Sequence, residues 1–274
     1  RDHLAALAAA WSPAGVGFAG EGLLPDGDDT AVAFAVLRRH GLLIDPAVFK
    51  LFEADDYFFC FPIERNHSLS TNAHILEALK NCPASPDRRR MMAKAASYLA
   101  STCLPEGYWQ DKWHVSPHYA TSEAVSALTG INTDLVARAI RWIIDTRHPE
   151  GCWGVMGGTA EETAMAVKAL LAAWQAGIAF GKAEWEVLHK GAAYLSETWE
   201  QTDHPELWVG KGSYTPYAVV RASILGVLYR YLTMLAGQGS PEPKGGRRVA
   251  SAVRNKEGHR GGKGEEKREL VHPA

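Results

Sequence analysis

Three carboxylates lie within four residues, Asp26, Asp28 and Asp29, directly before an apolar helical run that starts at Thr30. Carboxylates this close cannot all remain ionised once water is excluded, so one proton is shared or held at a raised pKa. A carboxylic acid that keeps a proton near neutral pH can act as a general acid. A cluster of three carboxyl groups beside an apolar surface therefore predicts a site that protonates a poor base.

Two simpler interpretations of the acidic cluster need no catalysis. A calcium loop of the EF-hand type requires Gly at its sixth position and Glu at its twelfth. Counted from Asp26, those positions hold Ala31 and Leu37, which excludes such a loop. Capping of the following helix needs one carboxylate and does not explain three, but it stays open as an alternative.

Five apolar runs, which recur at intervals of roughly 40 to 50 residues, must position this cluster. Each follows a small or hydroxyl residue and is rich in Ala and Val, as expected of helices buried on most faces. The runs cover residues 30–38, 70–80, 120–129, 162–172 and 215–229. More amphipathic helices are predicted between them, near residues 2–11, 46–53, 87–101, 133–145 and 183–197. Pro46 and Pro86 near helix starts, and Thr133 as an N-cap, support these boundaries.

This alternation predicts an all-α fold, an α/α toroid of inner and outer helices. We count about five helix pairs, whereas a closed toroid usually has six, so one pair is expected to be absent or supplied from elsewhere. Two Gly-containing turns, at 105–109 and 149–153, end in Trp and are predicted to pin one helix pair to the next.

All the inner helices are expected to run the same way, which gathers their N-termini at one mouth of the toroid. A polar and aromatic rim over an apolar interior is typical of a small-molecule site. The rim residues expected there are Asp26, Asp28, Asp29, Asn72, His74, Lys112, His114, His118, Tyr119, Glu161, Glu162, Lys211, Tyr214 and Thr215.

Composition limits the other function classes. A net charge of −2 gives no electrostatic case for nucleic acid or for a membrane surface as partner. Residues 237–274 hold nine Lys and Arg against five Asp and Glu, and are predicted to be a disordered basic tail after a barrel at 1–236. No apolar run approaches the ~18 residues of a transmembrane segment. Four cysteines without a CxxC pair predict free thiols and a cytoplasmic protein, and a homo-oligomer is left open.

Several motifs together resemble the class II terpene cyclases, specifically the β domain of bacterial diterpene cyclases of the copalyl and halimadienyl diphosphate synthase type. Asp26-Gly-Asp-Asp29 matches their DxDD signature. Family-like motifs follow in the family's order at residues 70–74, 111–121, 160–163 and 207–211, and the resemblance covers about residues 15–232. In this family the active site lies between the β domain and a helical γ domain. Only 25 residues precede Asp26, so we expect the γ domain and the first β helices to be missing from this chain.

The resemblance implies a role for each acidic residue. Asp28 is the expected proton donor, and Asp26 and Asp29 tune it. His74 falls where the family places a hydrogen-bond partner of the acid, and Asn72 is the second choice for that partner.

Substrate contacts are implied in the same way. Lys112 falls where the family has a lysine that contacts the substrate diphosphate, and Lys211 lies in another family-like motif. Trp113, Tyr119 and Trp208 are candidates for the π faces that stabilise a carbocation. A family segment that often reads GVGW is Gly15-Val-Gly-Phe18 here, so Phe18 is a departure that can alter the cavity wall.

Metal-dependent ionisation of a diphosphate, the other terpene strategy, needs a DDxxD cluster. Asp55-Asp56-Tyr-Phe-Phe59 and Asp28-Asp29-Thr-Ala-Val32 both lack the last acid, so the substrate diphosphate is expected to be retained. A zinc site of the protein-prenyltransferase kind needs clustered Asp, Cys and His, so no metal ligand is assigned in this chain. Mg²⁺ is expected to bind through the substrate diphosphate, with its protein ligands outside this chain.

The expected enzyme is therefore an isomerase that converts geranylgeranyl diphosphate into a bicyclic copalyl-type diphosphate by protonation. Two alternatives remain. One is a truncated, non-catalytic toroid that binds a partner. The other is a triterpene cyclase of the squalene-hopene type, which needs no diphosphate contact and against which Lys112 argues.

Overall fold

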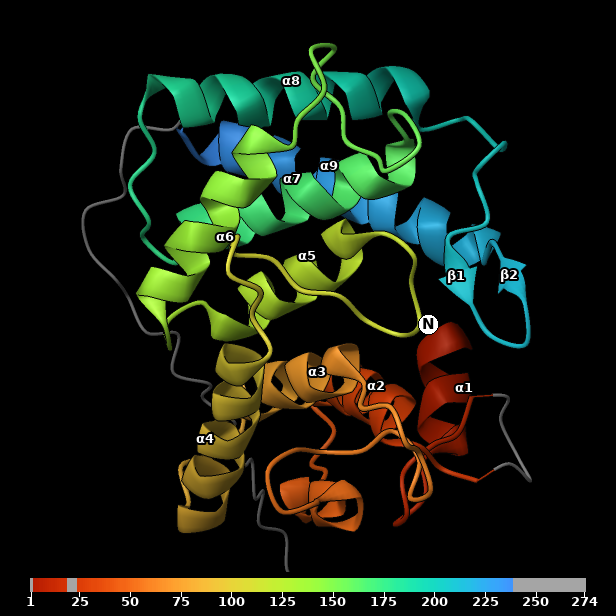
Figure 1. The fold of residues 1–274 in the computed structure, drawn as a ribbon. Coiled ribbons are helices and arrows are strands. Elements are labelled where there is room, and N and C mark those ends of the chain that lie inside the picture. The colour runs from red at the N-terminus through yellow and green to blue at the C-terminus, as the bar shows by residue number, and fades with distance from the viewer. Residues whose placement is uncertain (1, 19–23, 239–274) are drawn as a thin grey trace, which may run out of the picture.

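The computed structural model describes residues 2–18 and 24–238. The regular secondary structure of the described chain is helical apart from one short hairpin (Figure 1). Its elements are α1 (Asp2–Ala10), α2 (Gly27–Arg39), the 3₁₀ helix η1 (Pro46–Phe52), α3 (Leu69–Lys80), α4 (Pro86–Ser101), α5 (Pro117–Leu128), α6 (Thr133–Asp145), α7 (Ala160–Gln175), α8 (Lys182–Thr198), β1 (Trp208–Val209), β2 (Ser213–Tyr214) and α9 (Tyr217–Gln238).

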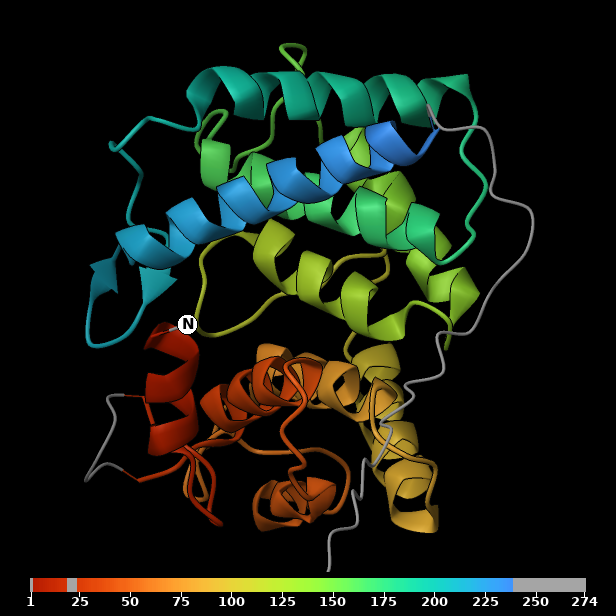
Figure 2. The same ribbon diagram turned by 180° about the vertical axis from the view of Figure 1, so that it is seen from behind.

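The Ala-rich helices pack against one another in chain order: α2 on α3, α3 on α5, and α5 on α7. Their buried faces carry small residues such as Ala31, Ala124 and Ala164, which let neighbouring helices approach closely. The amphipathic helices α4, α6 and α8 lie outside this row (Figures 1 and 2). The all-α arrangement of inner and outer helices predicted from the sequence is confirmed.

The two predicted Trp turns join an outer helix to the next inner one. Trp109 is fully buried, and its indole N–H donates to the carbonyl of Leu99 at 2.7 Å, near the end of α4. Its backbone N–H donates to the hydroxyl of Thr121 on α5 at 3.1 Å. The equivalent residues of the second turn are Trp153, Ile143 and Thr163. Each ring therefore fixes one helix pair to the next, as predicted.

Three local expectations were wrong. The helix at Pro46 is a 3₁₀ helix of seven residues rather than an α-helix. The N-cap of α6 is Asn132, whose side chain accepts from the N–H of Leu135, rather than Thr133. The final helix continues to Gln238, two residues past the boundary set at 236. The rest of the predicted basic tail lies outside the described residues.

Helix α9 also differs from expectation, because most of its surface is open. Val220, Ile224 and Val227 are buried against the rest of the protein, and α9 packs on α7 and α8. Tyr217, Tyr229 and Leu232 are 60% exposed or more, and Figure 2 shows α9 running across the near face. Within the described residues α9 is therefore not enclosed as a fifth inner helix.

The same helix qualifies the prediction that no apolar run approaches the length of a transmembrane segment. Its stretch Tyr217–Gly237 is long and apolar enough to cross a membrane by length and composition, with a mean hydropathy of 1.4. The sequence count missed it because a few polar residues interrupt the run.

Candidate active site

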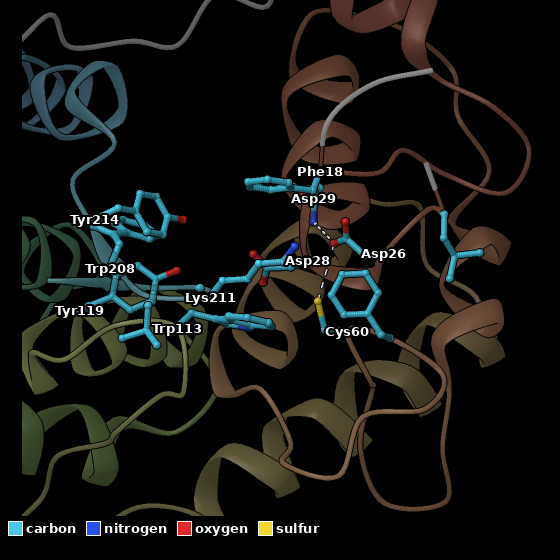
Figure 3. Close-up of a pocket in the computed structure, with 14 residues that line it drawn as sticks. Phe18, Asp26, Asp28, Asp29, Cys60, Trp113, Tyr119, Trp208, Lys211 and Tyr214 are labelled. Carbon is cyan, nitrogen blue, oxygen red and sulfur yellow. Dashed lines mark hydrogen bonds between the residues drawn. The ribbon is translucent and has the colours of Figure 1, made fainter. Parts of the chain in front are cut away.

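The predicted mouth is a cavity of about 550 Å³ between the start of α2, the start of α5 and the β1–β2 hairpin (Figure 3). It is lined by Phe18, Leu24, Asp26, Asp28, Asp29, Cys60, Phe61, Trp113, Tyr119, Trp208, Val209, Gly210, Lys211 and Tyr214. Asp26, Asp28 and Asp29 lie on one side with Phe18 beside them, and Tyr119, Trp208 and Tyr214 lie on the other (Figure 3). The structure thus brings together the DxDD residues and three of the predicted substrate contacts: Trp113, Tyr119 and Lys211.

Asp26 is the N-cap of α2. Its Oδ1 accepts from the backbone N–H of Asp29 at 2.8 Å, and the residue is only 1% exposed. Burial, together with the charge of Asp29, raises the pKa of Asp26 to about 7. Cys60, which the sequence analysis did not single out as a site residue, places its Sγ 3.7 Å from the same Oδ1. Asp26 therefore both caps the helix and holds a proton near neutral pH. The capping interpretation and the acid interpretation of the cluster are compatible with each other.

Asp28 extends from the first turn of α2 to meet α3. Its Oδ1 lies 3.0 Å from Nδ1 of His74 and accepts from the hydroxyl of Ser70 at 3.3 Å. Burial raises the pKa of Asp28, but the charge and hydrogen bond of His74 outweigh burial and lower the pKa overall. The geometry therefore makes Asp28 a stronger acid than an ordinary aspartic acid, because its conjugate base is held by an imidazolium.

His74 is held on its other side by α5. Its Nε2 lies 3.4 Å from Oε2 of Glu123, and Lys168 of α7 contacts both oxygens of Glu123 at 2.6 and 2.7 Å. Burial lowers the pKa of His74, but Asp28 and Glu123 outweigh burial and raise it to about 10. Neither Glu123 nor Lys168 was predicted from the sequence. The available signal was a charged residue in the middle of each otherwise apolar run.

Asn72 does not contact the acid, so the second-choice assignment was wrong. Its side-chain Oδ1 accepts from the N–H of Phe58 at 2.8 Å, and its Nδ2 donates to the carbonyls of Phe58 and Ser68 at 2.9 Å. The fully buried amide therefore fixes the loop before α3.

Lys112 also has a different place from the one expected. Its Nζ forms an ion pair with Glu64, donates to the carbonyl of Asn66 at 2.6 Å and lies 4.7 Å from the centre of the Trp113 ring. Lys211, in contrast, lines the cavity and extends from the hairpin toward its acidic side (Figure 3). The lysine available to a ligand of this cavity is therefore Lys211.

The aromatic side of the cavity, formed by Tyr119 and Trp208, is held by a hydrogen bond to the buried Glu161. The indole N–H of Trp208 donates to Oε1 of Glu161 at 2.7 Å, and the Tyr119 and Trp208 ring centres are 5.1 Å apart. His114 stacks on Tyr119 at 4.9 Å and is buried. His118 is buried against α6 instead of lying at the rim, and burial lowers its pKa to about 4.

The carboxylates of the cavity do not form a magnesium site. Asp26 caps a helix and Asp28 faces an imidazolium, so neither is available as a free oxygen ligand. Across residues 2–18 and 24–238, no group of three His, Cys, Asp or Glu side chains is arranged to hold a metal ion.

A helical toroid with a buried acid facing a largely apolar cavity agrees with the class II terpene cyclase family that the sequence motifs resemble. The chain belongs to the family of squalene-hopene cyclase C-terminal domains, which matches residues 65–217, more than half of its length.

Several curated relatives are diphosphate synthases. The chain is 42% identical over 219 residues to the ent-copalyl diphosphate synthase of Streptomyces sp. (strain KO-3988), a match that covers 77% of this chain and 42% of that protein. It is 36% identical over 239 residues to the labda-7,13-dienyl diphosphate synthase of Streptomyces clavuligerus, covering 84% and 42%. The chain thus spans less than half the length of these relatives.

Solved structures agree in fold. The ent-copalyl diphosphate synthase from Streptomyces platensis superposes with a TM-score of 0.76 at 35% identity, over 83% of this chain and 45% of that one. A type II terpene cyclase from Scytonema superposes with a TM-score of 0.63 at 14% identity, covering 84% and 80%, which shows a common fold.

Proposed function

We propose that this chain carries the acid machinery of a class II diterpene cyclase that acts on geranylgeranyl diphosphate. The observation that supports it most is the position of Asp28, bonded to His74 at 3.0 Å and lining a cavity whose other wall is aromatic. An alkene is a very weak base, so its protonation requires a strong acid in a site from which water is excluded.

The reaction begins from the protonated form of Asp28, which is a minor form at neutral pH and a stronger acid for the same reason, the lowering of its pKa by His74. Its O–H bond breaks as a C–H bond forms at the terminal alkene, which leaves a tertiary carbocation and an Asp28 carboxylate facing His74. Two ring closures consume two further alkenes, and loss of a proton to a base outside this assignment gives a bicyclic copalyl-type diphosphate. The C–O bond to the diphosphate stays intact throughout.

The cavity walls suit this chemistry. Trp113, Tyr119 and Trp208 offer π faces that stabilise a carbocation without reacting with it. A negative charge on Asp29 opposes ionisation of Asp28, and Asp26 adds to this effect once it has lost its own proton near pH 7. Lys211 is the proposed contact of the diphosphate. Mg²⁺ would enter with the diphosphate and find its ligands outside the described residues.

The cellular setting is proposed to be the cytoplasm. Cys60, Cys82, Cys103 and Cys152 are all free thiols, as expected of a protein in a reducing compartment.

The test combines turnover with binding. The protein is incubated with geranylgeranyl diphosphate and Mg²⁺, and the dephosphorylated products are identified by mass spectrometry. We expect a bicyclic alcohol from the wild type, at least a hundredfold less from Asp28→Asn, and a raised KM for Lys211→Ala. The S. platensis enzyme serves as a positive control for the assay.

Two outcomes would favour the alternatives. Quenching of tryptophan fluorescence by geranylgeranyl diphosphate without any product would support the binding toroid, since Trp113 and Trp208 line the cavity. Cyclisation of squalene but not of the diphosphate would support a triterpene cyclase, the class named by the matching family.

A further inference from the structure

Four charged side chains form a continuous row across the inner helices, one from each of α2, α3, α5 and α7. Asp28 meets His74 at 3.0 Å, His74 lies 3.4 Å from Glu123, and Glu123 receives two contacts from Lys168 at 2.6 and 2.7 Å. The row begins with Asp28 at the cavity and ends with Lys168 on α7. Its last two members have no part in the proposed chemistry so far.

Stability alone does not account for this row. The side chains of His74 and Glu123 are 17% and 13% exposed, and Lys168 is 26% exposed. A buried ion pair is often no more stabilising than apolar residues of the same size. Glu123 is, in addition, the only Asp, Glu, Lys or Arg in α5, where its neighbours Ala124 and Val125 are fully buried. A charge kept at that position points to a role for the row as a whole.

The geometry gives Glu123 a specific effect on His74. A carboxylate at Nε2 favours a proton on that ring nitrogen, and in the imidazolium form Nδ1 carries a second proton that it donates as a hydrogen bond to Oδ1 of Asp28. The other oxygen of Asp28 is then the one that carries the transferable proton. Lys168 makes this possible because its two contacts keep Glu123 ionised inside the helical layer.

We propose that Glu123, anchored by Lys168, is a positioning residue that holds His74 as an imidazolium with its Nδ1–H directed at Asp28. The proposal rests on the proposed function, since it assigns the acid strength of Asp28 to this row. Other groups that face the pair are Asp26 and Asp29 at the start of α2, and Asp111 and Tyr119 near the start of α5. All four are acids. Glu123 differs from them because it contacts Nε2 of His74, the ring nitrogen that faces away from Asp28, and because Lys168 contacts Glu123 in turn.

The experiment is an NMR titration of the imidazole nitrogens in protein labelled with ¹⁵N-histidine. The chain has 11 histidines, and His74→Gln identifies the signals of His74. In the wild type we expect both ring nitrogens of His74 to stay protonated through pH 8. In Glu123→Gln we expect the titration midpoint to fall by about one pH unit or more, a tenfold or greater loss of proton affinity.

Two further variants make the result decisive. The double variant Glu123→Gln with Lys168→Met removes both charges, so it leaves no buried lysine unpaired if the single variant folds poorly. Glu77→Gln is the matched control, since Glu77 lies on α3 with His74 but pairs with Lys80 at 3.0 Å. A lowered midpoint in the single and double variants, with Glu77→Gln unchanged, would support the proposal.

An unchanged His74 titration in a folded Glu123 variant would overturn it. The NMR result reads the charge of His74 directly, so it stands whether or not the product assay succeeds. Where turnover is measurable, Glu123→Gln should lower kcat at least tenfold and leave KM within twofold, which a merely structural role would not do.

Discussion

Replacing His74 with Gln removes the charge that faces Asp28 while keeping a side chain that can donate a hydrogen bond. Two unit charges 3.0 Å apart interact by about 5 kcal/mol at an effective dielectric of about 20. Solvent reduces this, because the Asp28 side chain is 23% exposed. The net value of a hydrogen bond to a charged group is about 1.5–3 kcal/mol, which corresponds to about one to two pKa units at Asp28.

We therefore expect kcat of His74→Gln to fall by about ten to a hundredfold, with KM for geranylgeranyl diphosphate nearly unchanged. The loss is a weaker acid rather than a weaker complex, because His74 does not line the cavity. Initial rates are measured by mass spectrometry of the dephosphorylated product between pH 5.5 and 8.5. The matched control is His118→Gln, a buried histidine that packs on Trp142 away from the cavity.

Two results would refute this reasoning. One is a kcat for His74→Gln within twofold of the wild type at all pH values. The other is an equal loss in His118→Gln, which would mean that the effect reports general damage to the fold.

Two other perturbations test the surroundings of the acid. The pKa of Asp26 is raised from 3.8 in a free side chain to about 7 in the folded protein, so its contribution to stability is full below pH 3.8 and is lost as pH rises through 7. Asn can also cap the helix but does not titrate, so the free energy of unfolding of Asp26→Asn, measured with urea, should rise relative to that of the wild type between pH 4 and 7, by at most about 4 kcal/mol. A difference between the two proteins that does not change with pH would contradict this. Trp208→Phe leaves the buried Glu161 without its 2.7 Å donor and should lower the free energy of unfolding by about 1–3 kcal/mol. An unchanged urea midpoint would show that the hairpin does not depend on this bond.

The helical layers were predictable because burial leaves a periodic trace along the chain. The Ala-rich run near residues 162–172 lies inside α7, where nearly every residue is buried. The Trp turns were predictable for a similar reason, since a large ring after a tight glycine turn has only the next helix to pack against. The exposure of α9 was not predictable, because its composition resembles that of the buried helix α7 although its neighbours differ.

Some residues of the site could not be assigned from the local sequence. Asn72 and His74 are two residues apart, so they point about 200° apart around α3, and only the rotation of that helix decides which one meets Asp28. Lys112 was the expected contact of the diphosphate and Lys211 a further substrate-binding candidate, but Glu64 forms an ion pair with Lys112. Contacts between residues far apart in the chain depend on packing, which leaves no local pattern.

By itself the sequence determined the helices, their order and the acid cluster at the start of α2, because these follow from periodicity and spacing within a few turns of chain. Only the tertiary structure decided which partner strengthens the acid, which lysine reaches the cavity, and that Glu123 and Lys168 extend from His74. The physical reason is that charge–charge contacts form between side chains of different helices, and their distances are set by how those helices pack.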